Sequence, residues 1–437
     1  MMRRASAATT LTAPGWCIVA SAGVLFALGL LSIYVTDTAY YAGHDGPLNA
    51  RKQGLILLLG IVLGAYILRA GYRRFAGGSY WFFALSIVLL IPPVLARFTG
   101  QSFGGLIPVL NGARRWIRLP LFQIQPSEVF KLALILALAW YLRYRSNTRT
   151  FAGVAAPLML SAVPLGLILL EPDLGTALLI PPLVLVMLYL AGAKTSHLLG
   201  LIGLAVAAAP LAWSGLEDYQ RRRVLAVVLQ SATIREIALV DPEGYSFLGS
   251  RRDIAEWERA AGFQLVQSKN AIGSGGWTGF GWGQGPFVEY PLLPDRHNDF
   301  VFAVIAHQWG LVGGGLVLAA YAGILGAGTV IASATKEPFG RLVAAGIVTS
   351  IGLQVVVNIG MTVGLLPVTG MTLPLVSYGG CSLLMNVAAL AVLISISQHR
   401  PFLLSRPPFG FAATARRLLR LELRDPEGSP APAPREG

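Results

Sequence analysis

WCIVASAGVLFALGLLSIYV, residues 16–35, is an apolar stretch without a single charged side chain. A helix of about 20 such residues crosses the roughly 30 Å hydrocarbon core of a bilayer. The whole chain has a similar character, because 54% of its 437 residues are hydrophobic and only 13% are charged. Ordinary soluble domains carry nearly twice that share of charge. The sequence therefore predicts an all-α, polytopic membrane protein, since lipid offers no partner for open backbone groups.

Comparable apolar stretches recur along the chain. The ten predicted spans lie near residues 16–35, 54–70, 79–96, 128–142, 151–170, 174–192, 197–215, 300–332, 341–365 and 381–398. They divide the chain into an N-terminus at 1–15, a transmembrane domain at 16–399 with a large extracytoplasmic loop at about 217–299, and a basic, Pro-rich tail at 400–437. The first span shows no convincing small-residue cleavage site, so we expect an uncleaved anchor.

The basic residues predict the orientation in the membrane. Short loops rich in Lys and Arg stay in the cytoplasm, and one side of the predicted topology carries Arg3, Arg4, Arg69, Arg73, Arg74, Arg143, Arg145, Arg149, Lys194, Lys336 and Arg341. Both termini are therefore predicted to be cytoplasmic. This topology and attraction to anionic lipid explain most of the net charge of +13, so we predict no nucleic-acid binding. The two cysteines, Cys17 and Cys381, indicate neither a disulfide framework nor a metal site.

One loop on the predicted outer side departs from the charge pattern. In NGARRWIRLP the residues Arg114, Arg115 and Arg118 surround Trp116. One interpretation is an interfacial belt of aromatic and basic residues. The other is a pocket for an anionic ligand that approaches from outside.

Ionisable residues also occur within or beside the spans, where burying a charge costs at least about 2.5 kcal/mol. In QIQPSEVFKLAL, Glu128 and Lys131 are three residues apart and share one helix face. In LLEPDLGTALL, Glu171 and Asp173 stand at the outer end of the fifth span. Each set is interpreted either as an internal ion pair or helix cap, or, with the outer arginines, as a polar cavity that opens outward.

Three further segments lie toward the predicted outer side. QSKNAIGSGGWTGFGWGQG, residues 267–285, lacks the βαβ surroundings of a phosphate loop, and its glycines favour a flexible loop whose backbone approaches a bulky ligand. LLPDRHNDFVFAVIAHQ, residues 292–308, places Asp299 directly before an apolar span. Residues 365–384, LLPVTGMTLPLVSYGGCSLL, are uncharged and could form a re-entrant turn.

In this order the motifs resemble the SEDS family of bacterial cell-wall polymerases, over roughly residues 16 to 400. The resemblance is carried by RRWIRLPLFQIQPSEVFKLA, EPDLGTA, the Gly-rich segment followed by LLPDRHNDFVFAVIA, and NIGMTVGLLPVTGMTLPLVSYGG. PDLGTA and NIGM are more similar to the RodA branch, which serves elongation, than to the FtsW branch, which serves division.

The resemblance implies a peptidoglycan glycosyltransferase of the bacterial cytoplasmic membrane that extends glycan strands from lipid II by β-1,4 glycosyl transfer. It also implies a class B penicillin-binding protein, a transpeptidase, as the partner. Mg²⁺ or Mn²⁺ would suit carboxylates and phosphate oxygens as a cofactor, but no ligand cluster in the sequence requires a metal.

The resemblance aligns Asp299 with the catalytic carboxylate of the family, and the alternative is that Asp299 caps a helix beginning at Phe300. The residues predicted to bind substrate are Arg114, Arg115, Trp116, Glu128, Lys131, Asp173, Lys269 and His297. A flippase or other transporter with buried ionisable groups, and a non-catalytic scaffold, are the competing classes of function.

The chain departs from the family pattern at several positions. His307 and Gln308 replace two acidic residues, Cys381 replaces Ser, and Asn298 replaces Thr. The outer loop is also longer than expected, with VLQSATIREIALV and SRRDIAEWERAAG as apparent additions. We therefore expect partner docking or regulation to differ.

Overall fold

The computed structural model describes residues 11–40, 48–110, 113–119, 123–145, 147–216, 218–241, 243–248, 251–255, 257–259 and 262–398. The predicted tail at 400–437 and most of the predicted N-terminus lie outside these residues. The helices are α1 (Ala13–Tyr40), α2 (Leu48–Ala70), α3 (Tyr72–Ala76), α4 (Ser79–Thr99), α5 (Pro126–Leu142), α6 (Phe151–Leu170), α7 (Leu174–Leu190), α8 (Thr195–Ser214), α9 (Asp218–Val228), α10 (Ala232–Val240), α11 (Arg251–Ala255), α12 (Phe263–Ser274), α13 (Pro286–Glu289), α14 (Val301–Ala334), α15 (Pro338–Thr362) and α16 (Gly380–Gln398). Short 3₁₀ turns are η1 (Asn147–Arg149), η2 (Ser246–Leu248) and η3 (Trp257–Arg259).

All ten predicted spans are helical. Within the described ranges seven helices are long and apolar enough to cross a membrane, namely α1, α2, α4, α6, α14, α15 and α16. The other three predicted spans correspond to α5, α7 and α8, and the last two contain shorter apolar helices. The prediction of an all-α, multi-pass membrane protein is therefore confirmed.

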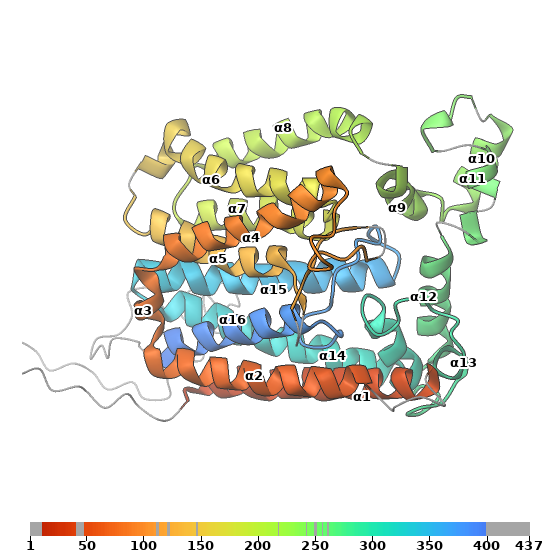
Figure 1. The fold of residues 1–437 in the computed structure, drawn as a ribbon, viewed down its shortest axis with the longest axis horizontal. Helices are drawn as coiled ribbons and strands as arrows, with labels where there is room; N and C mark the ends of the chain where they lie inside the picture. Colours follow the sequence, from red (N-terminus) through yellow and green to blue (C-terminus); the bar gives the residue numbers. More distant parts are fainter. Residues whose placement is uncertain are drawn as a thin grey trace, which may run out of the picture. The chain divides into compact units, whose positions relative to one another are not determined.

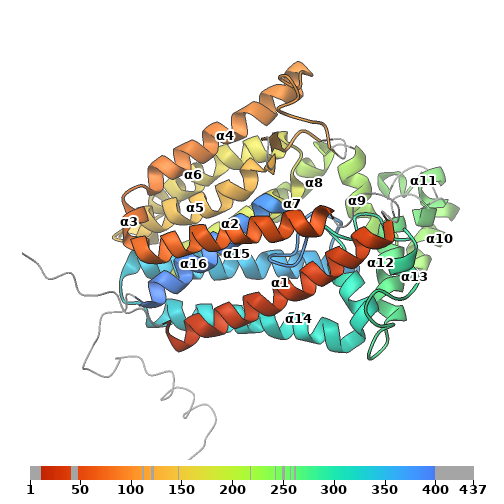
Figure 2. The same ribbon diagram turned by 60° about the horizontal axis from the view of Figure 1, so that its bottom comes forward.

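The helices pack into a bundle with α5 and α15 near its centre. Figures 1 and 2 show α1 running along α14 and α2 running along α16. Helix α5 contacts α4, α7, α15 and α16, and nearly all its side chains are buried. It starts with Pro126 at a position where a missing N–H costs no hydrogen bond. A central α5 means that Glu128 and Lys131 face protein and not lipid.

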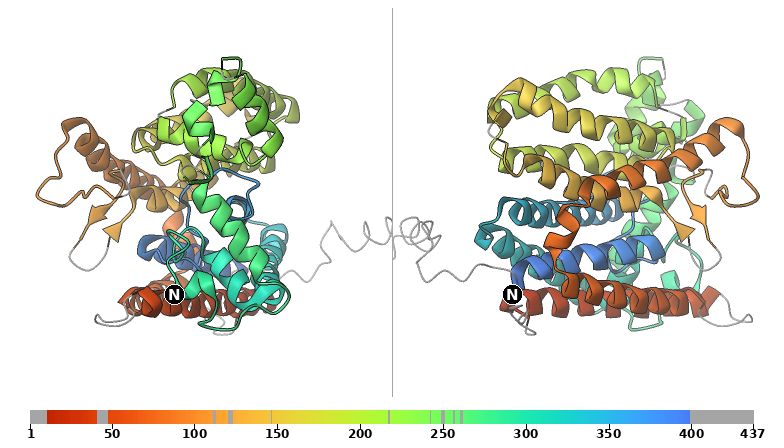
Figure 3. Two further views of the ribbon diagram at one scale, coloured as in Figure 1. Left: turned by 90° about the vertical axis from the view of Figure 1, so that its right-hand side faces the viewer. Right: turned by 60° about the vertical axis from the view of Figure 1, so that its left-hand side comes forward.

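Helices α9 to α13 gather at one end of the bundle, which we call the loop-bearing end (Figure 1). The antiparallel strands β1 (Ile117–Arg118) and β2 (Gln123–Ile124) lie toward the same end (Figure 3). Helix α3 lies at the opposite end and carries Arg73 and Arg74, two of the residues that predicted the cytoplasmic side.

The long loop has a small hydrophobic core of its own. Its buried side chains are Leu225, Leu229, Ala238, Leu248, Ile254, Trp257 and Leu265. Four of these, Leu229, Ala238, Ile254 and Trp257, belong to the two stretches that lengthen the loop relative to the family pattern. The additions therefore fold onto α9 and α12 instead of forming an unstructured connection.

Helix α14 is interrupted at Gly310, whose φ of 61° and ψ of −154° are not helical. The Gly-rich segment at 273–285 occupies the break. Backbone hydrogen bonds run from Phe280 to His307, from Gly281 to Gln308, from Leu311 to Gly276 and from Val312 to Trp277. A Cβ on Gly279 would lie 2.2 Å from the carbonyl oxygen of Gln308, so this close approach needs glycine. The backbone of this segment therefore approaches α14 closely, and its approach to a ligand stays a prediction.

Candidate active site

Asp299 lies on a turn that other segments hold from several sides. The side chain of Asn358 in α15 donates to the carbonyl oxygen of Asp299 at 3.1 Å and to that of Met371. The backbone N–H of Tyr378 donates to His297 at 2.9 Å. The guanidinium of Arg296 is buried and donates to the backbone carbonyls of Val288 in α13, of Tyr290 directly after α13, and of Thr36 in α1. The position of Asp299 is thus fixed by tertiary contacts.

The carboxylate of Asp299 does not cap α14. The capping position belongs to Phe300, and no side-chain hydrogen bond is made there. Burial, together with the nearby charge of Asp295, raises the pKa of Asp299 to about 7, although the guanidinium groups of Arg223 and Arg115 oppose this rise. Asp299 therefore changes its protonation near neutral pH, as a general base should.

Arg223 of α9 comes close to this carboxylate. A Cβ added to Gly370 would lie 3.5 Å from both Arg223 Nη1 and Asp299 Oδ2. The φ of Gly370, +75°, also favours glycine. A side chain there would enter the space between the guanidinium and the carboxylate.

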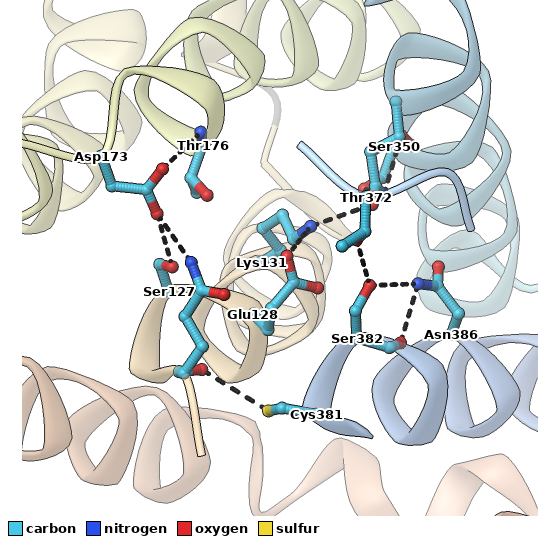
Figure 4. Close-up of polar contacts among 12 residues, drawn as sticks. Ser127, Glu128, Lys131, Asp173, Thr176, Ser350, Thr372, Cys381, Ser382 and Asn386 are labelled. Carbon is cyan, nitrogen blue, oxygen red and sulfur yellow. Dashed lines mark hydrogen bonds and ion pairs between the residues drawn. The ribbon is translucent and has the colours of Figure 1, made fainter. Parts of the chain in front are cut away.

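Arg115 and Asp173 lie at the turn between α6 and α7. The buried guanidinium of Arg115 donates to the carbonyl oxygens of Glu171, at 3.1 Å, and Pro172, and it lies 4.0 Å from Asp173 Oδ1. Asp173 caps α7 through the N–H of Thr176 and accepts a hydrogen bond from Ser127 Oγ at 2.8 Å (Figure 4). The capping interpretation of Asp173 is therefore correct, and Arg115 connects this turn electrostatically with Asp299.

Glu171 is fully buried, and neither of its carboxyl oxygens has a hydrogen-bond partner among the described residues. Burial raises its pKa to about 9, and the charge of Asp173 contributes in the same direction. Glu171 is therefore protonated at neutral pH.

The predicted ion pair in α5 is present. Lys131 Nζ lies 2.8 Å from Glu128 Oε1, and both side chains are buried (Figure 4). Lys131 also donates to Gln354 Oε1 of α15 at 3.0 Å, and the amide of Gln354 donates to Ser350. The two charges are compensated inside a polar network between α5 and α15.

The other predicted residues are less closely associated with Asp299. Arg114 donates to the carbonyl oxygens of Gly100 and Gln101, both at 2.7 Å, and Trp116 is half-buried. Lys269 is exposed and donates to a residue of the long loop. His297 belongs to the turn of Asp299, and burial lowers its pKa, which favours neutral imidazole.

Sequence reasoning missed Arg223, Gln354 and Asn358 as parts of this region. Arg223 stands in the basic run DYQRRR, and Gln354 and Asn358 are polar residues within a hydrophobic span. Polar side chains in a span were therefore the available signal. Among the described residues no three His, Cys, Asp or Glu side chains come together as metal ligands, and we assign none.

Comparison with known proteins places this arrangement in a family. The chain matches the FtsW/RodA/SpoVE family, described as cell cycle proteins, over residues 15–401. It is 35% identical to the peptidoglycan glycosyltransferase MrdB of Escherichia coli K12, covering 87% of this chain and 93% of that protein. It is 32% identical to the stage V sporulation protein E of Bacillus subtilis, covering 90% and 99%.

Solved structures agree with this match. One comes from work on polymerization and crosslinking by a peptidoglycan synthase complex, with a TM-score of 0.67 and 31% identity over 90% of this chain and 99% of the other. Another is the rod shape determining protein RodA of Thermus thermophilus, with a TM-score of 0.60 and 28% identity over 90% and 98%. The chain belongs to the FtsW/RodA/SpoVE family.

Proposed function

We propose that this protein is a peptidoglycan glycosyltransferase that polymerises lipid II during cell elongation, with Asp299 as its general base. The observation that carries the proposal is the carboxyl of Asp299, held on a fixed turn, with a pKa of about 7 and Arg223 nearby. The E. coli relative is named as an enzyme of this class.

In the proposed reaction, Asp299 removes the proton from the acceptor hydroxyl as its oxygen attacks the anomeric carbon of the donor sugar. The new glycosidic C–O bond forms while the bond from that carbon to the lipid pyrophosphate breaks. The pyrophosphate departs with the bonding electron pair and remains on its polyprenyl chain. Because this leaving group is already good, the protein has mainly to accept the proton and hold the geometry.

Positive charge beside Asp299 has a second role in this reaction. The guanidinium groups of Arg223 and Arg115 both act on Asp299 electrostatically. Guanidinium matches phosphate oxygens in charge and geometry, so these groups would stabilise the negative charge that develops on the departing pyrophosphate.

The same proposal predicts the orientation of the protein in the membrane and the class of its partner protein. The loop-bearing end would face outward, and both termini would lie in the cytoplasm of a bacterial cell. The partner would be a class B penicillin-binding protein, in line with the similarity to a chain of a peptidoglycan synthase complex.

The test is polymerisation of purified lipid II by the protein, alone and with its transpeptidase, in wild type and in Asp299→Asn. Asn keeps the size of the side chain but cannot accept a proton, so we expect no polymer from a variant that still inserts and folds. Transport of lipid II across vesicles without polymer would favour a flippase, and near-normal polymer from Asp299→Asn would refute the role of Asp299.

A further inference from the structure

A polar cavity lies at the loop-bearing end, apart from the residues assigned to catalysis. Its volume is about 190 Å³, and its lining residues are Gln230, Arg235, Trp257, Leu265, Val266, Lys269 and Asn270. The first three belong to the stretches that lengthen the long loop, and the other four belong to α12. The cavity thus exists because the additions fold against α12.

The polar lining is rich in hydrogen-bond donors. Lys269 Nζ donates to Gln230 Oε1 at 3.2 Å, and an ammonium group has three donors. Trp257 is only 3% exposed, and its Nε1 is buried without a partner among the described residues. The guanidinium of Arg235 lies 4.6 Å from the centre of the Trp257 ring and adds positive charge to the same wall. An acceptor with negative charge would satisfy these donors.

The rest of the lining is apolar. Leu265 and Val266 line the cavity and pack in the same hydrophobic cluster as Trp257, so a bare phosphate ion would leave part of the wall without a complementary group. A carboxylate attached to small aliphatic groups fits both parts. We propose that this cavity binds the terminal carboxylate of a short peptide whose side chains are small and apolar.

The position of the cavity identifies the source of that peptide. Gln230 donates to the carbonyl oxygen of Gly364 at 2.7 Å, beside the end of α15. On α12, Gln264 donates to the carboxylate of Asp295 at 3.3 Å, and Asp295 lies on the catalytic turn. The cavity is therefore joined to the turn of Asp299 through one helix. Resting on the proposed function, the peptide is the stem peptide of lipid II or of the growing strand.

The first experiment measures binding alone. Full-length protein in detergent is titrated with N-acetyl-D-alanyl-D-alanine and with its C-terminal amide, followed by saturation-transfer NMR. We expect the acid to bind and the amide to bind at least tenfold more weakly, because a charge-assisted hydrogen bond is lost. Lys269→Met should weaken binding of the acid to the same degree. Lys336→Met, at an exposed lysine outside this cavity, should leave binding of the acid unchanged.

A second variant separates the indole N–H from the packing of the loop. Trp257→Phe keeps an aromatic ring in the small hydrophobic core but removes the unpartnered donor. This variant should weaken binding of the acid severalfold without changing binding of the amide. Equal binding of acid and amide to wild type, or wild-type binding by Lys269→Met, would overturn the proposal.

The second experiment distinguishes this proposal from the proposed function. Wild type is given lipid II with a free or an amidated peptide terminus, and KM and kcat are measured separately. A higher KM for the amidated substrate at similar kcat supports the stem peptide as the ligand, and equal KM values overturn that source. If no polymer forms from either substrate, the proposed function fails, while the result of the dipeptide titration still decides whether the cavity binds a carboxylate.

Discussion

Arg223→Gln should move the pH dependence of polymerisation to higher pH. The active form of a general base is deprotonated, so kcat in wild type should rise with pH through about 7, the pKa of Asp299, and then level off. The guanidinium of Arg223 opposes the rise in that pKa. Removing this guanidinium should therefore raise the pKa of Asp299 and move the rising part of the plot of kcat against pH to higher pH.

The size of the displacement follows from geometry. Arg223 Nη1 and Asp299 Oδ2 each lie 3.5 Å from one point, the position of a Cβ on Gly370. The two atoms are therefore at most about 7 Å apart, where unit charges interact by about 2.4 kcal/mol at an effective dielectric of about 20 and by about 0.6 kcal/mol in bulk water. These limits correspond to roughly 1.7 and 0.4 pKa units. Asp299 is half-buried, so we expect an upward shift of about one unit, which makes kcat at pH 7, relative to the plateau of the same variant at high pH, about fivefold lower than in wild type.

The assay is the initial rate of lipid II polymerisation at saturating substrate from pH 5.5 to 9.5. Saturation removes the effect of weaker substrate binding. Loss of charge stabilisation on the departing pyrophosphate lowers kcat by the same factor at every pH, so only the pKa effect moves the midpoint of the profile. Arg222→Gln is the matched control, because Arg222 is exposed, carries the same charge on the same helix and is not among the groups that shift the pKa of Asp299. A profile for Arg223→Gln that coincides with wild type, or a shift equal to that of Arg222→Gln, would refute the reasoning.

Three further predictions concern the interior of the bundle. The folded state keeps a proton on Glu171 that the unfolded state releases, so the free energy of unfolding of wild type should fall as pH rises from the ordinary pKa of 4.5 toward about 9. Glu171→Gln should remove this fall, and urea unfolding should show a gain of about 3 kcal/mol at pH 7 relative to low pH. Parallel plots of unfolding free energy against pH for the two proteins would contradict this prediction. Neutralising either Glu128 or Lys131 should cost about 3–5 kcal/mol in thermal unfolding, and neutralising both should recover part of that loss; single costs that simply add up in the double variant would exclude a coupled pair. Arg115→Lys should lower both the melting temperature and the activity, since a single ammonium cannot reproduce the fork that serves two carbonyls, and full retention of both would argue against this anchoring role.

Features that depend on local periodicity could be predicted from the sequence. Hydropathy alone located ten apolar helices, seven of which are long and apolar enough to cross a membrane, because each span must satisfy its backbone internally and expose apolar side chains to lipid. The spacing of Glu128 and Lys131 predicted their contact, since residues three apart share a helix face. Asp173 next to an apolar run predicted a helix cap for the same local reason.

Features that depend on chain segments far apart were not predicted. Arg223 and Asp299 are separated by the whole folded part of the long loop, so no periodic pattern connects them. The Gly-rich segment has the composition of a flexible loop, and only the break at Gly310 shows that its backbone completes α14. Arg114, predicted as a ligand for pyrophosphate, donates to two nearby backbone carbonyls, which its charge alone could not reveal.

The absence of a capping bond from Asp299 bears directly on its chemistry. A carboxylate that caps a helix accepts backbone N–H groups, which stabilise the charged form and lower the pKa. Asp299 precedes α14 without making such a bond, while Asn358 and Tyr378 hold its turn through backbone carbonyls. The turn is thus positioned without using the carboxylate oxygens, and burial can raise their pKa to about 7. A carboxylate next to a membrane span is then a stronger base than an exposed one, and the cost of its desolvation is offset in part by the arginines that would also bind the leaving pyrophosphate.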